Sequence, residues 1–319
     1  MHNTIEAQVK SVRTEALGIN SYELVPTQSG GELPAFAAGA HIDLQLPGGM
    51  VRSFSLLNPQ NERNRYVIAV ARDAASRGGS RYIHDSVHAG TALRISQPKN
   101  NFPLAEEARH SLFIAGGIGI TPLWCMIQRL QDLGRSWELW YCIRTREHAA
   151  FMNELRGLPE GEKRVHFNFD HEPGGKILDL GPLVASAAPG THLYSCGPLP
   201  MLAAFESAAA SRPPEAVHVE YFSAKEAPAA GGGFTVVMAR SGKTVFVPDG
   251  KTILDTILDL GIDTPYSCME GTCGECQTEV LEGTPDHRDV FLTKQDHAAN
   301  KKMMICCSGA KTDKLVLNI

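Results

Sequence analysis

The order of apolar and polar residues divides the chain into three regions. The first hundred residues hold short runs of alternating character, such as YVIAVA at 66–71, separated by Gly, Pro and Asn. Alternation with a period of two predicts strands with one buried face, so this region favours a small antiparallel β-barrel. Further on, apolar strand segments alternate with helical ones, with strands expected at 112–115, 139–143, 165–169, 192–196 and 217–222. That order is typical of a parallel α/β sheet.

The third region follows a segment without large apolar side chains, AKEAPAAGGG at 224–233, which predicts a flexible tether. Beyond it, FTVVMA at 234–239 and TVFVP at 244–248 predict a hairpin. Thr252 and Asp255 form the pattern of a capping box for the next helix, which Gly261 should end. We therefore expect three domains, at 1–104, 105–225 and 234–319, with a linker at 226–233.

The composition narrows the classes of function. The 319 residues carry a net charge of −5, which supplies no basic field for nucleic acid or for an anionic membrane surface. The N-terminus lacks an apolar signal core, and the uncharged stretch at 111–127 is broken by glycines and a proline, so we expect neither export nor a membrane span. Most of the eight cysteines lie near the C-terminus. Such clustering favours a metal site in a reducing cytoplasm over a disulfide scaffold.

The cysteines near the C-terminus have a specific spacing. Cys268, Cys273 and Cys276 form C-x4-C-x2-C, and Cys306 follows after 29 intervening residues. This spacing is typical of a plant-type [2Fe–2S] cluster. Structural zinc is the alternative, although zinc sites usually pair two separate knuckles. Cys307 lies beside Cys306, and either could supply the fourth thiolate.

Two glycine-rich turns follow predicted strands of the second region. GGIGITP at 116–122 opens into a helix, where Thr121 can cap and Pro122 fits the first helical position. The second turn, SCGPLP at 195–200, also leads into a helix. Each alone is more often a simple chain reversal, but two such turns at the carboxyl ends of strands favour a nucleotide site. Arg144 and Arg146, after the second strand, could bind a ribose 2′-phosphate or simply be solvated.

The first region adds two short motifs, RSFS at 52–55 and GGS at 78–80. The glycines stand at a predicted helix start, where backbone N–H groups suit a terminal phosphate, although a structural turn has the same pattern. In this order, RSFS, GGS, GGIGITP, CGP and the cysteine loop resemble the phthalate dioxygenase reductase family. The resemblance spans nearly the whole chain and includes ERNRYVIAVARD at 62–73 and PDHRDVFLT at 285–293.

This resemblance implies a flavin-binding β-barrel at 1–104, an NAD-binding α/β domain at 105–225 and a β-grasp ferredoxin domain at 234–319. It also implies FMN, NADH and a [2Fe–2S] cluster, and a separate Rieske-type oxygenase as the electron acceptor. We further expect a monomeric, cytoplasmic protein. NADH releases electrons as a pair, whereas the cluster accepts one at a time, and a flavin can divide the pair. A self-contained flavin oxidoreductase acting on a small molecule and a redox-sensing module are the alternatives.

The resemblance further implies roles for single residues. It selects Cys306 as the fourth cluster ligand. It places Cys196 near the nicotinamide and Ser55 against the flavin ring, and these two residues are the catalytic candidates. Phe54 replaces the family's tyrosine, which removes one hydroxyl. Phe222 could pack by the flavin or belong to the core at a strand end. The other residues that it places at a cofactor are Arg52, Ser53, Ala69, Val70, Arg72, Gly78, Gly79, Ser80, Gly116, Gly117, Ile118, Gly119, Thr121, Pro122, Arg144, Gly197 and Pro198.

Three further residues of potential chemistry are interpreted as structural. Cys125 and Cys142 lie in apolar helix and strand patterns, which favour buried, unreactive thiols. Because four thiolates already complete the cluster, His287 in PDHRD is interpreted as a surface or packing residue.

Overall fold

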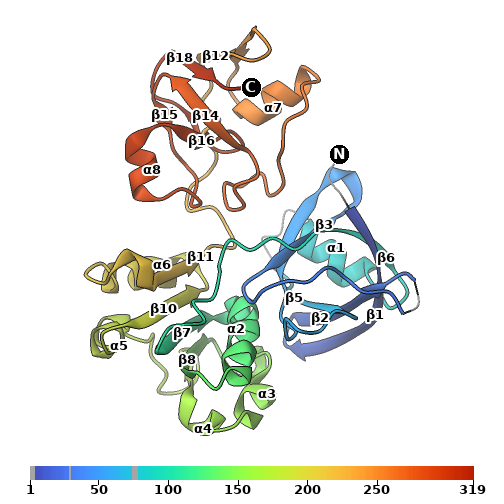
Figure 1. Ribbon diagram of the computed structural model, residues 1–319, viewed down its shortest axis with the longest axis vertical. Coiled ribbons are helices and arrows are strands. Elements are labelled where there is room, and N and C mark those ends of the chain that lie inside the picture. Colours follow the sequence, from blue (N-terminus) through green and yellow to red (C-terminus); the bar gives the residue numbers. More distant parts are fainter. Residues whose placement is uncertain (1–3, 29, 74–77) are drawn as a thin grey trace. The chain divides into compact units, whose positions relative to one another are not determined.

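The structure, a computed structural model, describes residues 4–28, 30–73 and 78–319 (Figure 1). Contacts divide it after Glu220, so that the first unit contains both the barrel and the parallel sheet and the second runs from Tyr221 to Ile319. Within the described residues, no helix is long and apolar enough to cross a membrane. The predicted fold class, a barrel, a parallel sheet and a ferredoxin domain, is confirmed.

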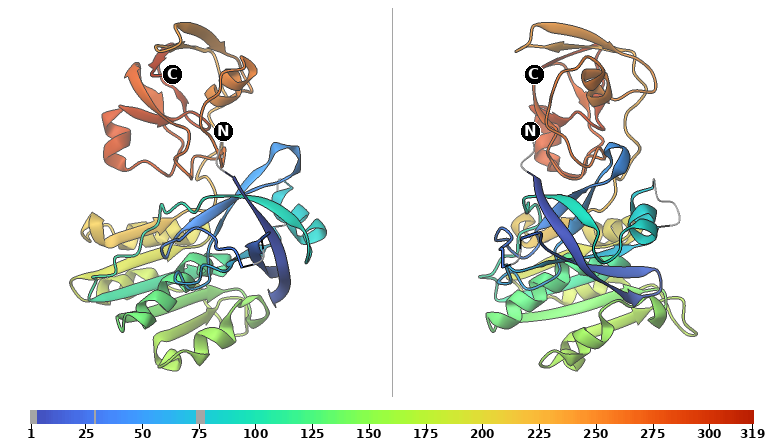
Figure 2. Two further views of the ribbon diagram at one scale, coloured as in Figure 1. Left: turned by 45° about the vertical axis from the view of Figure 1, so that its right-hand side comes forward. Right: turned by 90° about the vertical axis from the view of Figure 1, so that its right-hand side faces the viewer.

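The barrel consists of six antiparallel strands in the order β4-β3-β6-β1-β2-β5. The alternating apolar residues that predicted these strands point inward and form one core with Ile83 of the short helix α1. In Figure 2 these strands are drawn in colours from blue to cyan. The bounds are β1 Thr4–Ala16, β2 Ile19–Pro26, β3 His41–Gln45, β4 Val51–Ser55, β5 Tyr66–Ala71, α1 Gly79–Ser86 and β6 Ala92–Ser96.

The second sheet has five parallel strands in the order β11-β10-β7-β8-β9. Alternation along β7 separates its two faces, because Leu112 and Ile114 pack with α5 and α6 while Phe113 and Ala115 pack with α2. The bounds are β7 His110–Gly116, α2 Ile120–Asp132, β8 Ser136–Ile143, α3 Met152–Gly157, α4 Gly161–Arg164, β9 Val165–Phe169, α5 Leu180–Ser186, β10 Thr191–Cys196, α6 Leu199–Ala208 and β11 Val217–Glu220.

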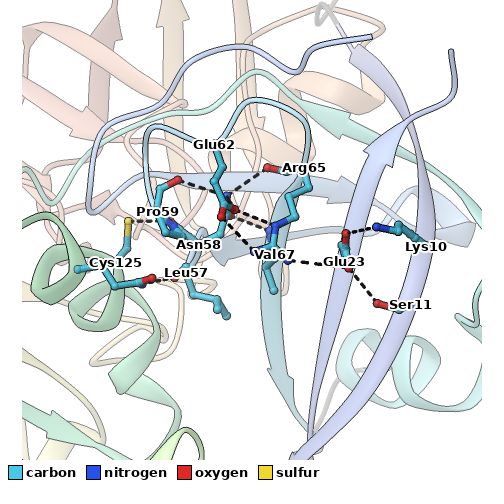
Figure 3. A network of polar contacts seen from close by, with 11 residues as sticks. Lys10, Ser11, Glu23, Leu57, Asn58, Pro59, Glu62, Arg65, Val67 and Cys125 are labelled. Atoms are coloured by element: carbon cyan, nitrogen blue, oxygen red, sulfur yellow. Dashed lines mark hydrogen bonds and ion pairs between the residues drawn. The ribbon is translucent and has the colours of Figure 1, made fainter. Parts of the chain in front are cut away.

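A polar network joins the barrel to helix α2 (Figure 3). The Cys125 thiol donates to the Asn58 carbonyl at 3.2 Å, and the Gln128 amide donates to the Leu57 carbonyl at 2.8 Å. The Asn58 side chain in turn accepts from Val67 N at 2.8 Å and donates to the Arg65 carbonyl at 3.2 Å. Because Leu57 follows RSFS closely and α2 begins within GGIGITP, the network fixes the two motif segments relative to each other.

The C-terminal unit has a sheet in the order β13-β12-β18-β14-β16 and a small pair, β15-β17. The hairpin at β12 and β13 and the capping box of Thr252 with Asp255 are present as predicted. The bounds are β12 Phe234–Met238, β13 Lys243–Val247, α7 Ile253–Asp259, β14 Gln277–Glu282, β15 Pro285–Asp286, α8 Lys294–Ala299, β16 Lys302–Met304, β17 Gly309–Ala310 and β18 Lys314–Leu317.

The segment at 224–233, predicted to be a flexible tether, is held by hydrogen bonds over part of its length. Ala229 N donates to the Cys307 carbonyl at 2.7 Å, and the Ala230 carbonyl accepts from Gly250 N at 2.7 Å. Gly233 N donates to the Val247 carbonyl at 2.9 Å. The lack of large apolar side chains thus predicted a flexible segment through Gly233, but backbone hydrogen bonds, which need no side chain, hold its last five residues to the C-terminal unit.

Candidate cofactor sites

The four predicted thiolates of the C-terminal unit meet. Cys268, Cys273 and Cys276 lie on the loop between α7 and β14, and Cys306 follows β16. Each is buried, from 9% exposed for Cys268 to 3% for Cys306. The Cys306 sulfur is in hydrogen-bonding contact with the sulfurs of Cys268 and Cys276, and that of Cys268 with Cys273.

Backbone N–H groups point at these sulfurs. Glu270 N and Thr272 N lie 3.3 and 3.4 Å from the Cys268 sulfur, and Cys268 N lies 3.5 Å from that of Cys273. Contact between the sulfurs lowers the pKa of Cys268 and raises the pKa of Cys273 and of Cys306, as expected of thiols close enough to share protons. Four thiolates with N–H donors aimed at them suit a [2Fe–2S] cluster, whose sulfurs carry negative charge.

Cys307 lies beside this group, and its side chain contacts Cys306. It is fully buried, and its thiol donates to the Met304 carbonyl at 3.8 Å. A Cβ on Gly271, which has a φ of +74°, would lie 2.5 Å from the Cys307 sulfur, so this sulfur packs against the backbone of the cysteine loop. The geometry supports Cys306 as the fourth ligand.

The two glycine-rich turns of the first unit pack directly against each other. A Cβ on Gly119 would lie 2.1 Å from the Cys196 carbonyl oxygen, and one on Gly116 would lie 2.5 Å from the Pro198 ring. A Cβ on Gly197 would lie 2.9 Å from the Gly116 Cα. These glycines therefore allow the turns to touch, in addition to any approach of a ligand. Gly117 differs, because its φ is +51° and nothing lies within 4 Å of its Cβ position.

The predicted start of helix α2 is wrong by two residues. The helix begins at Ile120 after a 3-10 turn at Gly117–Gly119, so Thr121 and Pro122 are its second and third residues. The Thr121 hydroxyl donates to the Ile118 carbonyl at 3.0 Å instead of capping a free N–H. The 3-10 turn thus begins the helix without a side-chain cap. Cys125 is buried in this helix as predicted, and burial raises its thiol pKa to about 12.

Cys196 has an acidic neighbour that the motifs did not indicate. Cys196 is fully buried at the end of β10 and pairs in register with Glu220 on β11. Glu220 is partly exposed as a residue, yet its Oε2 atom is buried and has no hydrogen bond within the described residues. Burial raises the Glu220 pKa to about 8, and burial together with Glu220 raises the pKa of the Cys196 thiol. A carboxylate inside the apolar run VHVEYF was the signal that could have found it.

In the barrel, RSFS and GGS meet at the start of α1. A Cβ on Gly79 would lie 2.8 Å from the Arg52 side chain, which therefore crosses the first turn of the helix. Phe54 packs against the barrel core, whereas Ser53 is exposed and donates to Asp43 at 2.6 Å. The guanidinium and the helix N-terminus together suit a phosphate.

Ser55 ends β4 and carries an orphaned polar atom. It is 5% exposed, and its buried Oγ has no hydrogen-bond partner among residues 4–28, 30–73 and 78–319. Since buried hydroxyls are nearly always hydrogen-bonded, this atom fits a contact to a polar edge of a ring such as a flavin. Gly78, with a φ of +98°, caps α1, and the Ser80 hydroxyl accepts from Asp73 N at 3.3 Å.

The predicted flavin residues of β5 separate into two groups. Ala69 packs toward α2, and Val70 lies in the barrel core. Arg72 pairs with Asp85 of α1 at 3.0 Å. A polar pocket lies between β1, β2 and α2, but none of the residues that the resemblance places at a cofactor lines it.

The remaining candidates lie at strand ends. Arg144 is exposed after β8, and Arg146 pairs with Glu172 at 3.3 Å while its guanidinium stands 4.7 Å from the centre of the Phe169 ring. Phe222 lies beyond the end of β11 and is 42% exposed, so its interpretation as a core residue is wrong. Its alternative placement beside the flavin stays a prediction.

Paired glycine turns at the carboxyl ends of a parallel sheet and a buried four-thiolate loop define an oxidoreductase that combines a nicotinamide domain with an iron–sulfur domain. Comparison with known proteins agrees, because residues 113–207 match the oxidoreductase NAD-binding domain and residues 236–311 match the 2Fe-2S iron-sulfur cluster binding domain.

The chain is 53% identical over 287 residues to phenoxybenzoate dioxygenase subunit beta of Ectopseudomonas oleovorans, covering 90% of this chain and 89% of that protein. It is 49% identical to tetrachlorobenzoquinone reductase of Sphingobium chlorophenolicum, covering 99% of this chain and 98% of that one. The solved structure of phthalate dioxygenase reductase aligns with a TM-score of 0.77 at 37% identity over 99% of this chain and 98% of that one. The chain belongs to the phthalate dioxygenase reductase family.

Proposed function

We propose that this protein carries electrons from NADH, by way of FMN, to a [2Fe–2S] cluster, and from there to a separate Rieske-type oxygenase. The observation that carries the proposal is the presence, in one chain, of a nicotinamide-type turn pair and a buried cysteine quartet with N–H groups aimed at its sulfurs. The relative named as a dioxygenase subunit and the structure named phthalate dioxygenase reductase support an oxygenase as the acceptor.

In this proposal, Cys268, Cys273, Cys276 and Cys306 hold the cluster. Arg52 and the N-terminus of α1 bind the FMN phosphate, and the unpartnered Ser55 hydroxyl binds the flavin ring. When bound, FMN supplies the conversion of a hydride into single electrons. We further propose that the protein works as a monomer in the cytoplasm, where its cysteines stay reduced.

The nucleotide lies across the two glycine turns, with the nicotinamide beside Cys196. Both Cys196 and Glu220 have pKa values raised by burial, so this end of the site is uncharged near neutral pH. An uncharged, water-poor surface suits hydride transfer, because it excludes proton and solvent side reactions.

The decisive experiment is reconstitution. Purified protein should be brown, contain FMN and two irons, and reduce cytochrome c with NADH. Added to a Rieske-type oxygenase encoded beside its gene, it should support substrate turnover that depends on both proteins. Colourless protein that holds only zinc and lacks NADH-dependent activity would overturn the proposal.

A second candidate function is reduction of a quinone without any partner, favoured by the 49% identity to tetrachlorobenzoquinone reductase. It predicts fast NADH-dependent loss of a chlorinated benzoquinone with the hydroquinone as product. If that reaction outpaces electron delivery to every neighbouring oxygenase, the quinone is the acceptor. If quinone reduction is slow and the oxygenase turns over, the first proposal holds.

A further inference from the structure

Two histidines and an aspartate of the C-terminal unit converge outside the cysteine loop. His287 and Asp289 lie in the extended segment between β15 and α8, and His297 lies in α8. One ligand atom from each lies within 4.8 Å of the others. The His297 Nε2 is 3.2 Å and the His287 Nδ1 is 3.8 Å from the same atom, Asp289 Oδ1.

The environment fixes which nitrogen of His287 can bind a cation. The Asn300 amide nitrogen donates to the Ala298 carbonyl at 3.3 Å, so its oxygen faces the His287 Nε2 at 3.2 Å. An amide oxygen only accepts, so Nε2 carries the hydrogen and Nδ1 of the neutral ring carries a lone pair. Nδ1 is buried and has no hydrogen bond within the described part of the chain.

The lone pair of His287 Nδ1 therefore faces Asp289 Oδ1 at 3.8 Å, and neither atom can donate a hydrogen bond to the other. The Asp289 side chain is fully buried, and that of His287 is 8% exposed. Two facing acceptors in a buried site repel each other, and a cation between them would give both a partner.

We propose that His287, Asp289 and His297 bind a divalent transition-metal ion of the zinc type, separate from the [2Fe–2S] cluster. Imidazole nitrogen and carboxylate oxygen bind zinc at about 2.0–2.2 Å, which separates two tetrahedral ligands by roughly 3.4 Å. The observed separations of 3.2 and 3.8 Å from Asp289 bracket that value. Asn300 accepts from the opposite nitrogen of His287, as outer partners of metal-bound histidines do.

The remaining contacts leave room for solvent as the fourth ligand. The second Asp289 oxygen accepts from Leu292 N at 2.8 Å, which fixes the carboxylate, and the His297 side chain is 31% exposed. The exposed histidine edge gives the ion a route from solvent. Three protein ligands with one open position is a common arrangement for zinc.

The site lies behind the cysteine loop. Val290 N donates to the Gly271 carbonyl at 3.1 Å, and a Cβ on Gly271 would lie 3.0 Å from the Asp289 Cα. An ion here would link the 287–289 segment to α8, and this segment packs against the cysteine loop. The proposed ion therefore stabilises the conformation of the loop and takes no part in electron transfer.

The test uses tag-free holoprotein whose two irons and flavin have been counted. After incubation with zinc sulfate and gel filtration, the wild type should keep one zinc per chain without losing iron. His297→Gln should keep both irons but no zinc, and Asn300→Ala should bind zinc about tenfold more weakly. The matched control is His171→Gln, which changes an exposed histidine of the first unit and should keep one zinc.

Zinc-edge X-ray absorption of the wild type supplies a readout that needs no variant. Nitrogen and oxygen neighbours at about 2.0–2.1 Å are expected, whereas sulfur at about 2.3 Å would show zinc in the cysteine site and overturn the proposal. Failure of the wild type to retain zinc, or equal retention by His297→Gln, would overturn it as well. Neither result bears on cytochrome c reduction, which tests the proposed function separately.

Discussion

The cysteine loop of the C-terminal unit and the turn-built site of the first unit assemble their reactive groups in different ways. Three of the four thiolates lie within nine residues, on a loop whose backbone supplies its own N–H donors. The proposed nucleotide site instead lies where turns from β7 and β10 touch, beside a carboxylate from β11. A site on one loop depends mainly on local residues, whereas a site between strands depends on the packing of segments distant in sequence.

The largest effect is expected from Cys273→Ser, which removes one thiolate of the quartet. Cytochrome c reduction should fall to background, while ferricyanide reduction persists because the flavin alone can serve it. Cys307→Ser is the matched control, and it should keep two irons and cytochrome c reduction, since that sulfur faces the Gly271 backbone. Unchanged cytochrome c reduction by Cys273→Ser would place the cluster off the electron path.

In the other region, Gly119→Ala should separate the two turns. Its Cβ would lie 2.1 Å from the Cys196 carbonyl oxygen, and a backbone atom cannot move aside cheaply. Overpacking of this kind costs about 1–3 kcal/mol, so the melting temperature of the first unit should fall by roughly 2–12 °C and the KM for NADH should rise. Gly117→Ala, in open space, carries only the backbone penalty of a positive φ and should melt closer to the wild type.

Glu220 makes the first unit sensitive to pH. Its pKa in the folded protein is about 8, above its ordinary value of 4.5, so the folded state holds a proton that the unfolded chain releases. Stability should therefore be lost as pH rises from about 5 to 8, by at most roughly 1.4 kcal/mol per pH unit, and then level off. Glu220→Gln should remove this slope in melting scans at pH 6, 7 and 8. Parallel slopes in both proteins would contradict a buried, protonated carboxyl.

The smallest effect concerns the choice of nucleotide. Arg146 is engaged by Glu172 and by the Phe169 ring, so it is not free for a 2′-phosphate. Glu172→Gln should raise kcat/KM for NADPH by no more than about fivefold, since a half-exposed ion pair contributes at most about 1 kcal/mol. Glu154→Gln, at an exposed position of α3, is the control. A rise equal to that of the control would exclude this ion pair from nucleotide selection.

Several features followed from local patterns alone. Alternating residues placed β5, and apolar segments between helical ones placed β7 to β10. A polar residue three positions before an acidic one placed the capping box of α7. Thr121 failed as a cap because a 3-10 turn, invisible to residue preferences, begins α2. The tether was predicted too long because composition does not reveal backbone hydrogen bonds to Val247 and Cys307.

The sequence by itself determined the three-domain order and the thiolate spacing, because strand periodicity and loop ligands are encoded by near neighbours. Only the tertiary structure decided that Gly119 must lack a side chain beside Cys196, that Glu220 is a buried acid, and that His287, Asp289 and His297 converge. Each of these depends on which segments come into contact and on how far water is excluded between them. Contact and exclusion of water arise from packing, which no local pattern specifies.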